Sequence, residues 1–364
     1  MTIVTSLYVH VPFCRHLCNY CDFYKQKFDK PHAQREEFAA YLRASLERHE
    51  SIMREQGAQW APLETVYFGG GTPSLWDVDG AEIWKGMLPL TTDAEVTFEV
   101  DPGAWTPEGL AAWEDAGVNR YSVGTQSLDA EYLRILDRAH DREETFKLLR
   151  HFAGKNFSVD FLLGAPQGLK NRDVVKELEE LLSYGPKHLS LYILQPAAGY
   201  KLKAKIPDDE ITSREYLAVS EYLRSRGFHH YEVSNFALPG FESRHNLRYW
   251  HGESVAALGP TGTGYFAQGF EKAYRYKWKP GRPEVEIENL TLKELELEKL
   301  YLRLRLSEPF CVSDFTGVLD FEKSLESWQK RGLVLKVDNA WQMTPAAWVI
   351  LDSLLNELFS VATT

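Results

Sequence analysis

The sequence predicts an α/β fold, a full or partial (β/α) barrel followed by a small C-terminal helical domain, and three observations support this. Short β-rich runs alternate with amphipathic segments from the N-terminus to about Asn235, which is typical of right-handed βαβ units and a parallel sheet. Six or seven such units without a Gly-rich dinucleotide fingerprint after the first run favour a barrel. The distinctive polar residues also fall at expected strand ends, where such barrels place their functional sites.

The elements of the expected barrel, residues 1–235, follow from composition and apolar spacing. The expected strands are Leu7–Val11, Thr65–Phe68, Glu95–Val100, Asn119–Val123, Phe157–Leu163, His188–Leu194 and His229–Val233. The expected helices between them are Gln34–Glu55, Pro107–Ala116, Glu143–Phe152, Val174–Tyr184 and Ser213–Arg226.

The remaining sequence predicts two further segments. Residues 236–288 begin with a loop-like stretch, rich in Gly, His and aromatic residues, that extends to about Tyr276, and Lys277–Glu288 has the composition of a linker. Residues 289–364 predict a small helical or winged-helix-like domain that begins with a helix over Thr291–Arg305, capped by Thr291 with Glu294 three residues on. Its other expected elements are a helix over Phe321–Arg331, a hairpin over Leu333–Met343 and a last helix over Pro345–Leu358.

The composition predicts a soluble, cytoplasmic protein with no nucleic-acid partner. The 364 residues are 44% hydrophobic and 26% charged, which is typical of a globular chain. A formal net charge of -11 disfavours a polyanionic partner. No apolar run approaches the roughly 18–20 residues of a membrane span, and the N-terminus lacks signal-peptide features. A homodimer is left open by the sequence.

Three closely spaced cysteines after the first expected strand predict a metal centre. Cys14, Cys18 and Cys21 form a C-x3-C-x2-C triplet, which argues against a disulfide scaffold. Three thiolates can hold three irons of a [4Fe–4S] cluster and leave the fourth open to a small molecule. The alternatives are a Cys3His zinc site that uses His10 or His16, and three unliganded thiols.

The stretch from Tyr8 to Phe23, with its C-x3-C-x-aromatic-C spacing, resembles the signature of the radical SAM superfamily. This resemblance implies a partial, TIM-like barrel of the radical SAM type, a [4Fe–4S] cluster on the three cysteines and S-adenosylmethionine bound to the open iron. It also implies that Tyr20 lies against the adenine and that reductive cleavage of the cofactor gives a 5′-deoxyadenosyl radical.

A glycine-rich turn and further polar strand ends complete the expected cofactor site. The turn at residues 69–73, Gly-Gly-Gly-Thr-Pro, lets backbone approach a ligand closely, although an ordinary tight loop is the alternative. Residues 119–127 and 137–140 are similar to cofactor-binding motifs of the coproporphyrinogen oxidase branch of the superfamily. Structural ion pairs are the alternative for the charged residues, because a buried carboxylate such as Asp160 needs a partner. The implied cofactor-binding residues are Tyr8, Tyr20, Gly70, Gly71, Thr72, Glu99, Gln126, Arg138 and Asp160.

A third constellation places one imidazole among aromatic residues. The motif H-N-x-x-Y-W at residues 245–250 follows Y-E-V-S-N-F-A at residues 231–237. A single histidine near aromatic residues is more often structural than a metal ligand. An imidazole surrounded by aromatic rings nevertheless also suits a flat ligand with a central metal. The complete phrase is similar to that of the HemW haem chaperones, which implies haem-site roles for His245, Tyr249 and Trp250. Other histidines available to haem iron are His10, His16, His229, His230 and His251.

The resemblance to the HemW haem chaperones extends nearly end to end. Oxygen-independent coproporphyrinogen dehydrogenase has a further cysteine where this chain has Phe23, and an N-terminal extension where only seven residues precede Tyr8. Some ligand-side motifs depart from the family, including Thr263 in place of a histidine. The implied function is a haem chaperone that carries haem as cargo to haem-dependent respiratory proteins at the membrane. The alternatives are a radical SAM enzyme acting on a porphyrin or other organic substrate, and a structural zinc protein; no residue is assigned as catalytic.

Overall fold

The computed structural model describes residues 2–169, 171–268, 272–315 and 320–361. Its main sheet has nine strands in the order β11-β1-β4-β5-β6-β7-β8-β10-β9. The strands are β1 Thr2–Val11, β4 Ala58–Gly70, β5 Leu90–Val100, β6 Arg120–Gln126, β7 Phe157–Leu163, β8 His188–Ile193, β9 His229–Glu232, β10 Asn235–Ala237 and β11 Ala256–Leu258. Every pairing from β11 to β8 is parallel, which confirms the predicted partial (β/α) barrel.

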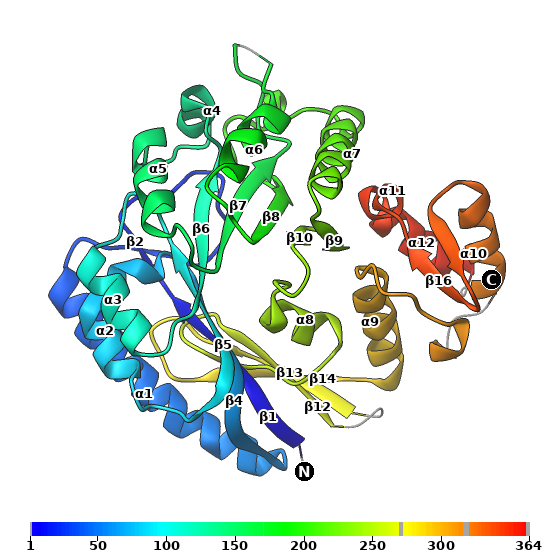
Figure 1. Ribbon diagram of the computed structural model, residues 1–364. Helices are drawn as coiled ribbons and strands as arrows, with labels where there is room; N and C mark the ends of the chain where they lie inside the picture. Colours follow the sequence, from blue (N-terminus) through cyan, green and yellow to red (C-terminus); the bar gives the residue numbers. More distant parts are fainter. Residues whose placement is uncertain (1, 170, 269–271, 316–319, 362–364) are drawn as a thin grey trace.

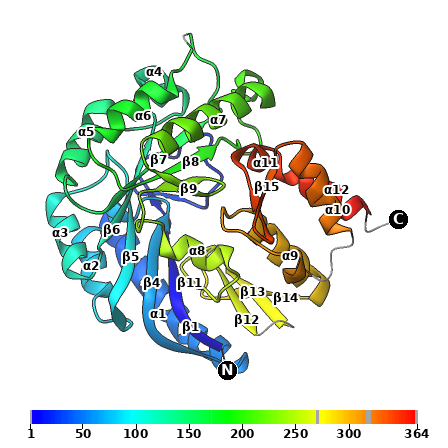
Figure 2. The same cartoon turned by 45° about the vertical axis from the view of Figure 1, so that its right-hand side comes forward.

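Helices cover the outer face of this curved sheet, as Figures 1 and 2 show. They are α1 Pro31–Glu55, α2 Asp77–Trp84, α3 Pro107–Asp115, α4 Ala130–Ile135, α5 Arg142–His151, α6 Val174–Leu182 and α7 Asp209–Ser225. Short 3-10 turns lie at Pro73–Trp76, Lys203–Lys205 and Val312–Asp314. The helix ranges predicted from apolar spacing agree with the observed ones to within a few residues.

Alternation along the strands separates two kinds of buried side chain. Phe68, Phe98 and Val123 belong to the large apolar core, where Trp113 of α3 packs edge-on against Phe68 and more nearly parallel to Phe98. Because successive strand residues point to opposite faces, the intervening positions face the barrel interior, and many of these are polar. A polar interior can be buried only if its groups find hydrogen-bond partners, so it constrains the fold as well as the site.

The segment 236–288 differs from the expected loop and linker. It contains β10, helix α8 Arg244–Trp250 and β11, followed by a separate sheet of three strands. Those strands are β12 Thr263–Gln268, β13 Lys272–Trp278 and β14 Val285–Leu290. The prediction of a linker was wrong because Pro and Gly also mark hairpin turns, here the turn between β13 and β14. The strand at His229 is also separated from β8 by the antiparallel β10.

The C-terminal part packs at the open side of the curved sheet in both views. Its helices and strands are α9 Leu292–Leu304, α10 Phe321–Lys330, β15 Val334–Val337, β16 Ala340–Met343, α11 Pro345–Val349 and α12 Leu351–Val361. The hairpin prediction is confirmed, whereas the predicted last helix is interrupted at Ile350, whose φ of -119° is not helical. Within the described residues, no helix has both the length and the apolar character needed to cross a bilayer.

The predicted capping box of α9 is confirmed: the Glu294 amide donates to Thr291 Oγ1 at 3.3 Å, and the Thr291 amide donates to Glu294 Oε2 at 2.8 Å. We expect Thr291→Ala to lower the free energy of unfolding by about 1 kcal/mol, because one N-terminal N–H of the helix loses its acceptor. Urea unfolding checks this, with Thr291→Ser as the control that keeps the hydroxyl. Equal losses in both variants would contradict a capping role.

Candidate functional site

The cysteine loop follows β1, and a short parallel pairing holds its two ends together. Strand β2, Phe13–Cys14, pairs with β3, Gln26–Lys27. Cys14 is buried, whereas Cys18 and Cys21 are partly exposed. In the described ranges, no three His, Cys, Asp or Glu side chains converge as a metal site, so the thiols are not arranged as ligands in this conformation.

The surroundings of the thiols fit the predicted cluster. Thr72 Oγ1 donates to Cys14 Sγ at 3.8 Å, and Arg138 Nη1 donates to Cys18 Sγ at 3.9 Å. Burial raises the pKa of Cys14 to about 11; the Thr72 hydrogen bond opposes this rise, and the nearby thiols of Cys21 and Cys18 add to it. Three neighbouring thiols, two of which already receive a hydrogen-bond donor, are a suitable set for iron, which takes cysteine as thiolate.

The histidines considered for a zinc site already have other contacts. The two ring nitrogens of His10 contact the Tyr8 hydroxyl at 3.1 Å and the Tyr24 carbonyl oxygen at 2.9 Å. His16 Nε2 lies 3.0 Å from a carboxylate oxygen of Asp137. Neither histidine joins the cysteines in this structure, so the geometry favours the three-thiol arrangement over a Cys3His site.

The glycine-rich turn packs directly on the cysteine loop. The Gly71 amide donates to the Val11 carbonyl at 2.8 Å, and a Cβ at Gly71 would lie 2.6 Å from the Phe13 carbonyl oxygen. A Cβ at Gly70, whose φ is 112°, would lie 2.6 Å from the His10 ring. These contacts alone require glycine at both positions, so their predicted contact with the cofactor remains a prediction.

Glu99, near the carboxyl end of β5, lies over this turn. Its carboxylate accepts hydrogen bonds from the Tyr67 hydroxyl at 3.0 Å and the Gly70 amide at 3.1 Å. Burial raises the pKa of Glu99 to about 8, and the charge of Asp160 adds to this effect. The Tyr8 ring lies 6.2 Å from that of Tyr67. The structure therefore gathers Tyr8, Glu99 and the turn at one end of the barrel.

Arg138 joins the barrel to the cysteine loop. Its guanidinium pairs with Asp101 and donates to the Gly124 carbonyl at 3.0 Å, in addition to its contact with Cys18. Burial acts to raise the pKa of Asp101, but the charge of Arg138 holds this pKa below its ordinary value. Among the described residues, Arg138 Nε is buried without an acceptor. One donor thus remains for a ligand.

Gln126 and Tyr20 lie on either side of this arginine. Gln126 ends β6 with a φ of 65°, a left-handed conformation that is uncommon for a residue other than glycine and is often found at functional sites. A Cβ at Gly124 would lie 3.5 Å from Gln126 Nε2 and 3.6 Å from Arg138 Nη2, so both side chains extend over Gly124. Tyr20 hydrogen-bonds Arg138 and packs on a small apolar cluster that includes Leu162.

Asp160 has the partners that its position in an apolar strand requires. Ser122 Oγ lies 2.9 Å from Oδ1 and 3.0 Å from Oδ2 of Asp160, and Ser190 supplies a further hydrogen bond. Burial raises the pKa of Asp160 to about 6, opposed by these hydrogen bonds and by the charge of Arg120. Arg120 is itself only 2% exposed and places a cation inside the barrel.

Helix α8, which carries His245, is held to the barrel by its N-terminus. Ser243 caps it by accepting the Asn246 amide at 3.3 Å, and the amide of Ser243 donates to the Tyr231 hydroxyl at 3.2 Å. The Glu95 carboxylate accepts the amides of Arg244 at 3.2 Å and His245 at 3.0 Å. These acceptors satisfy N–H groups that the first turn of a helix leaves free.

His245 is buried between two tyrosine rings and has one unpaired nitrogen. Its Nδ1 contacts Thr65 Oγ1 at 3.0 Å, and its ring centroid lies 5.4 Å from Tyr67 and 5.5 Å from Tyr249. Among the described residues, Nε2 is buried without a partner. Burial lowers the pKa of His245 to about 3, and the charges of Arg120 and Arg248 lower it further. The imidazole is therefore neutral at physiological pH.

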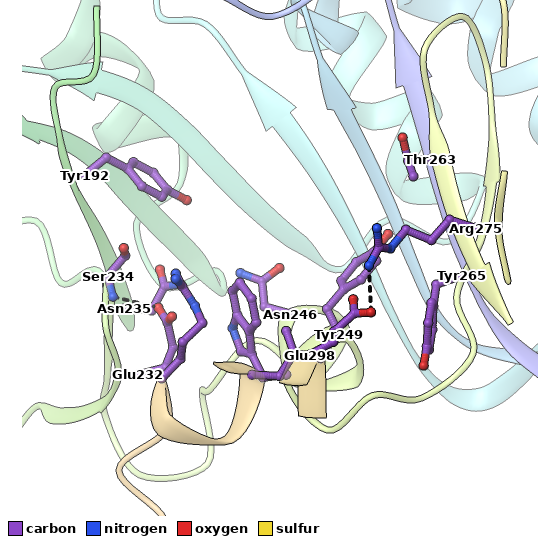
Figure 3. Close-up of a pocket in the computed structure, with 13 residues that line it drawn as sticks. Tyr192, Glu232, Ser234, Asn235, Asn246, Tyr249, Thr263, Tyr265, Arg275 and Glu298 are labelled. Carbon is purple, nitrogen blue, oxygen red and sulfur yellow. Dashed lines mark hydrogen bonds and ion pairs between the residues drawn. The ribbon is translucent and has the colours of Figure 1, made fainter. Parts of the chain in front are cut away.

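Two adjoining cavities lie beside α8, and the first of them also reaches α9 of the C-terminal part. The first, about 450 Å³, is lined by Glu232, Tyr249 and Trp250 among others, and the second, about 590 Å³, by Tyr8, His10 and His245 among others. Both are lined in part by Asn246, Tyr249 and Thr263. In Figure 3, Asn246 and Tyr249 lie between Glu232 and Arg275 at the two sides of the first cavity. Both volumes are in the range of small-molecule sites.

Sequence analysis missed several of the groups that support this site. They are Tyr67, Glu95, Asp101, Ser122 and Thr65. Asp101 directly follows the strand that carries Glu99, so its position at a strand end was a usable signal. The others lie within strands and look like ordinary strand residues.

Comparisons with known proteins show the family and the fold of this chain. A family model described as the radical SAM superfamily matches residues 8–175. The heme chaperone HemW of Synechocystis sp. is 32% identical over 88% of this chain and 82% of its own, and that of Escherichia coli is 29% identical over 97% of each. The solved coproporphyrinogen III oxidase (HemN) of Escherichia coli, described as a radical SAM enzyme, matches with a TM-score of 0.77 over 98% of this chain and 90% of that one. Its 19% identity supports the fold alone.

The raised pKa of Glu99 predicts a pH-dependent stability. Between its ordinary value of 4.5 and about 8, the unfolded chain ionises this carboxyl while the folded chain keeps the proton, so stability falls as pH rises. We expect Glu99→Gln to remove this loss of stability. The free energy of unfolding of the variant, relative to that of the wild type, should then rise by up to about 1.4 kcal/mol per pH unit in that window.

Urea unfolding at pH 5.5 and pH 8 measures this difference. The control is Glu37→Gln, at an exposed position of α1. A difference between Glu99→Gln and the wild type that stays constant with pH would show that Glu99 does not hold a proton in the folded protein.

Proposed function

The chain belongs to the HemW family of heme chaperones within the radical SAM superfamily, and we propose that it binds haem next to a [4Fe–4S] cluster and delivers it to haem-dependent proteins. The observation that carries this proposal is His245, whose buried Nε2 has no partner in the described structure. A neutral imidazole with one free nitrogen is a common ligand of haem iron.

Three features of His245 support a role as the iron ligand. Thr65 contacts the other ring nitrogen, and a hydrogen bond at that nitrogen commonly orients a metal-bound histidine. Arg120 and Arg248 disfavour the imidazolium, which cannot bind a metal through a protonated nitrogen. Tyr249 and Trp250 follow on the same helix and line the first cavity, where they offer aromatic surface to a flat ring. Because Nε2 is covered in this structure, ligation requires the side chains over it to move.

The other candidate histidines are less suitable. His230 contacts Ser220 at 2.9 Å and Tyr216 at 3.2 Å, so both ring nitrogens have partners. His229 and His251 contact Ser307 and Glu308. His10 lines the second cavity with His245, but its two nitrogens are also in contact with other groups.

The proposed cofactor residues are those gathered around the cysteine loop. Cys14, Cys18 and Cys21 would hold the cluster, which supplies one-electron chemistry when bound. Arg138 would offer its free Nε–H to the carboxylate of S-adenosylmethionine, and Gln126 lies beside it over Gly124. Tyr20, with its apolar neighbours, would contact the adenine.

A radical SAM enzyme acting on a porphyrin is the second candidate, since the second cavity joins the two halves of the site. It is lined by Tyr8 from the cofactor side and by His245 from the proposed haem side. Anaerobic release of methionine that depends on an added porphyrin would favour this enzyme over a chaperone.

We expect His245→Ala to weaken haem binding at least tenfold, because the iron loses its protein ligand. An anaerobic absorbance titration of the full chain, with its cluster reconstituted, measures the affinity and the stoichiometry. Added imidazole is expected to restore the spectrum of a nitrogen-ligated haem in the variant, which a purely structural role would not allow.

The matched control is His251→Ala, which ends the same helix and contacts Glu308 outside both cavities. It should bind haem as the wild type does, and iron content should be unchanged in both variants. Unaltered binding by His245→Ala would overturn the assignment of the ligand, and absence of stoichiometric binding by the wild type would overturn the chaperone proposal.

A further inference from the structure

The first cavity contains charged and polar side chains that binding of iron at His245 does not explain. It lies between α8, the β9–β10 connection, the β12–β13 hairpin and α9. Figure 3 places Glu232, Ser234 and Asn235 together at one side, across from Arg275 and Glu298. Arg275 is paired with Glu298 at 2.6 Å and with Glu288 at 3.0 Å, so its charge already has partners.

Polar atoms buried at the first side lack partners within the described residues. They are Glu232 Oε2, Asn235 Oδ1, Trp250 Nε1 and Arg305 Nε, and all four residues line this cavity. A buried polar atom without a hydrogen bond costs free energy, so such a cluster indicates a missing ligand. Two of these atoms are N–H donors, which require an acceptor.

Arg305 is held in place mainly by aromatic neighbours, and its charge acts on the buried carboxyl of Glu232. Its guanidinium lies 4.4 Å from the Trp250 ring centroid and 5.3 Å from that of Tyr301, and Nη1 donates to the Tyr301 hydroxyl at 2.8 Å. In the part of the chain that the structure describes, Arg305 forms no ion pair, in contrast to Arg303, which pairs with Glu308. An arginine fixed by aromatic stacking is well prepared to bind a carboxylate.

The carboxyl group of Glu232 can take up a proton, so it need not repel an anion bound at Arg305. Its side chain is fully buried, and Oε1 accepts the Ser234 amide at 3.0 Å. Burial raises the pKa of Glu232 to about 7, with the charge of Arg305 acting in the opposite direction. When protonated, Oε2 becomes a third donor on this side of the cavity.

We propose that Arg305 and Trp250 Nε1 bind a carboxylate substituent of the haem whose iron is ligated by His245. This inference rests on the proposed function. Haem carries two propionates at the edge of a flat ring. Of the two proposed donors, Trp250 directly follows Tyr249 on α8, and Arg305 lies at the C-terminal end of α9. Because the two cavities share Asn246, Tyr249 and Thr263, one flat ligand can reach from His245 to Arg305. The cavity would therefore select carboxylated porphyrins and fix the orientation of the ring.

The experiment compares haem with its dimethyl ester, in which both carboxylates are capped, by anaerobic absorbance titration of the full chain. The proteins are the wild type, Arg305→Gln, Arg305→Lys and, as matched control, Arg303→Gln. We expect the wild type and the control to bind haem roughly 10- to 100-fold more tightly than the ester, a typical effect of a buried charge-assisted hydrogen bond. In Arg305→Gln this preference should fall to near unity, and Arg305→Lys should keep part of it.

The outcomes separate this inference from the proposed function. Equal affinity of the wild type for haem and ester, or a preference that survives Arg305→Gln, would overturn the carboxylate site while leaving haem binding intact. Failure of both ligands to bind the wild type would overturn the proposed function itself. The comparison of ligands on the wild type needs no substitution, so it holds even where a variant is unstable.

Discussion

The buried carboxylates inside the barrel are held by hydrogen bonds from neighbouring strands, and both halves of the candidate site depend on this network. Glu99 is satisfied by Tyr67 and the Gly70 amide, and Asp160 by serines of the neighbouring strands. Each of these contacts joins adjacent strands at a fixed register, so the carboxylates have little freedom. A buried polar network of this kind is costly when incomplete, which ties the position of each group to the others.

The same network places helix α8. The ring of His188 links Ser158 Oγ at 2.8 Å to the Tyr231 hydroxyl at 2.8 Å, and that hydroxyl accepts the amide of Ser243 at the start of the helix. Thr65 and Tyr67 reach His245 from β4, and Tyr67 also contacts Glu99. The proposed haem ligand and the proposed cofactor site are thus joined through one strand, which keeps two chemistries close together without a separate scaffold.

The sequence predicted the barrel, five of the seven helices α1 to α7 and the C-terminal hairpin because these depend on local periodicity, but it missed the short helices α2 and α4. It failed for residues 236–288, where short strands carry no clear period and where the hairpin turn at Pro280–Pro283 resembles a linker. It also singled out Glu99, Arg138 and Asp160, but not Thr65, Glu95 or Tyr67. Their importance comes from pairing between strands far apart in the chain, which one sequence does not reveal. The domain boundaries and the ligand-binding roles of individual residues remain predictions.

In the proposed complex, a neutral, buried histidine of α8 ligates haem iron while the cysteines remain with the cluster. The most direct test is pulsed electron paramagnetic resonance of ferric haem bound to the full chain in which the histidines alone carry ¹⁵N. Coupling of the haem iron to one ¹⁵N nucleus, absent in His245→Ala, is the predicted result. A thiolate-ligated signal, or a ¹⁵N coupling that persists in His245→Ala, would contradict it.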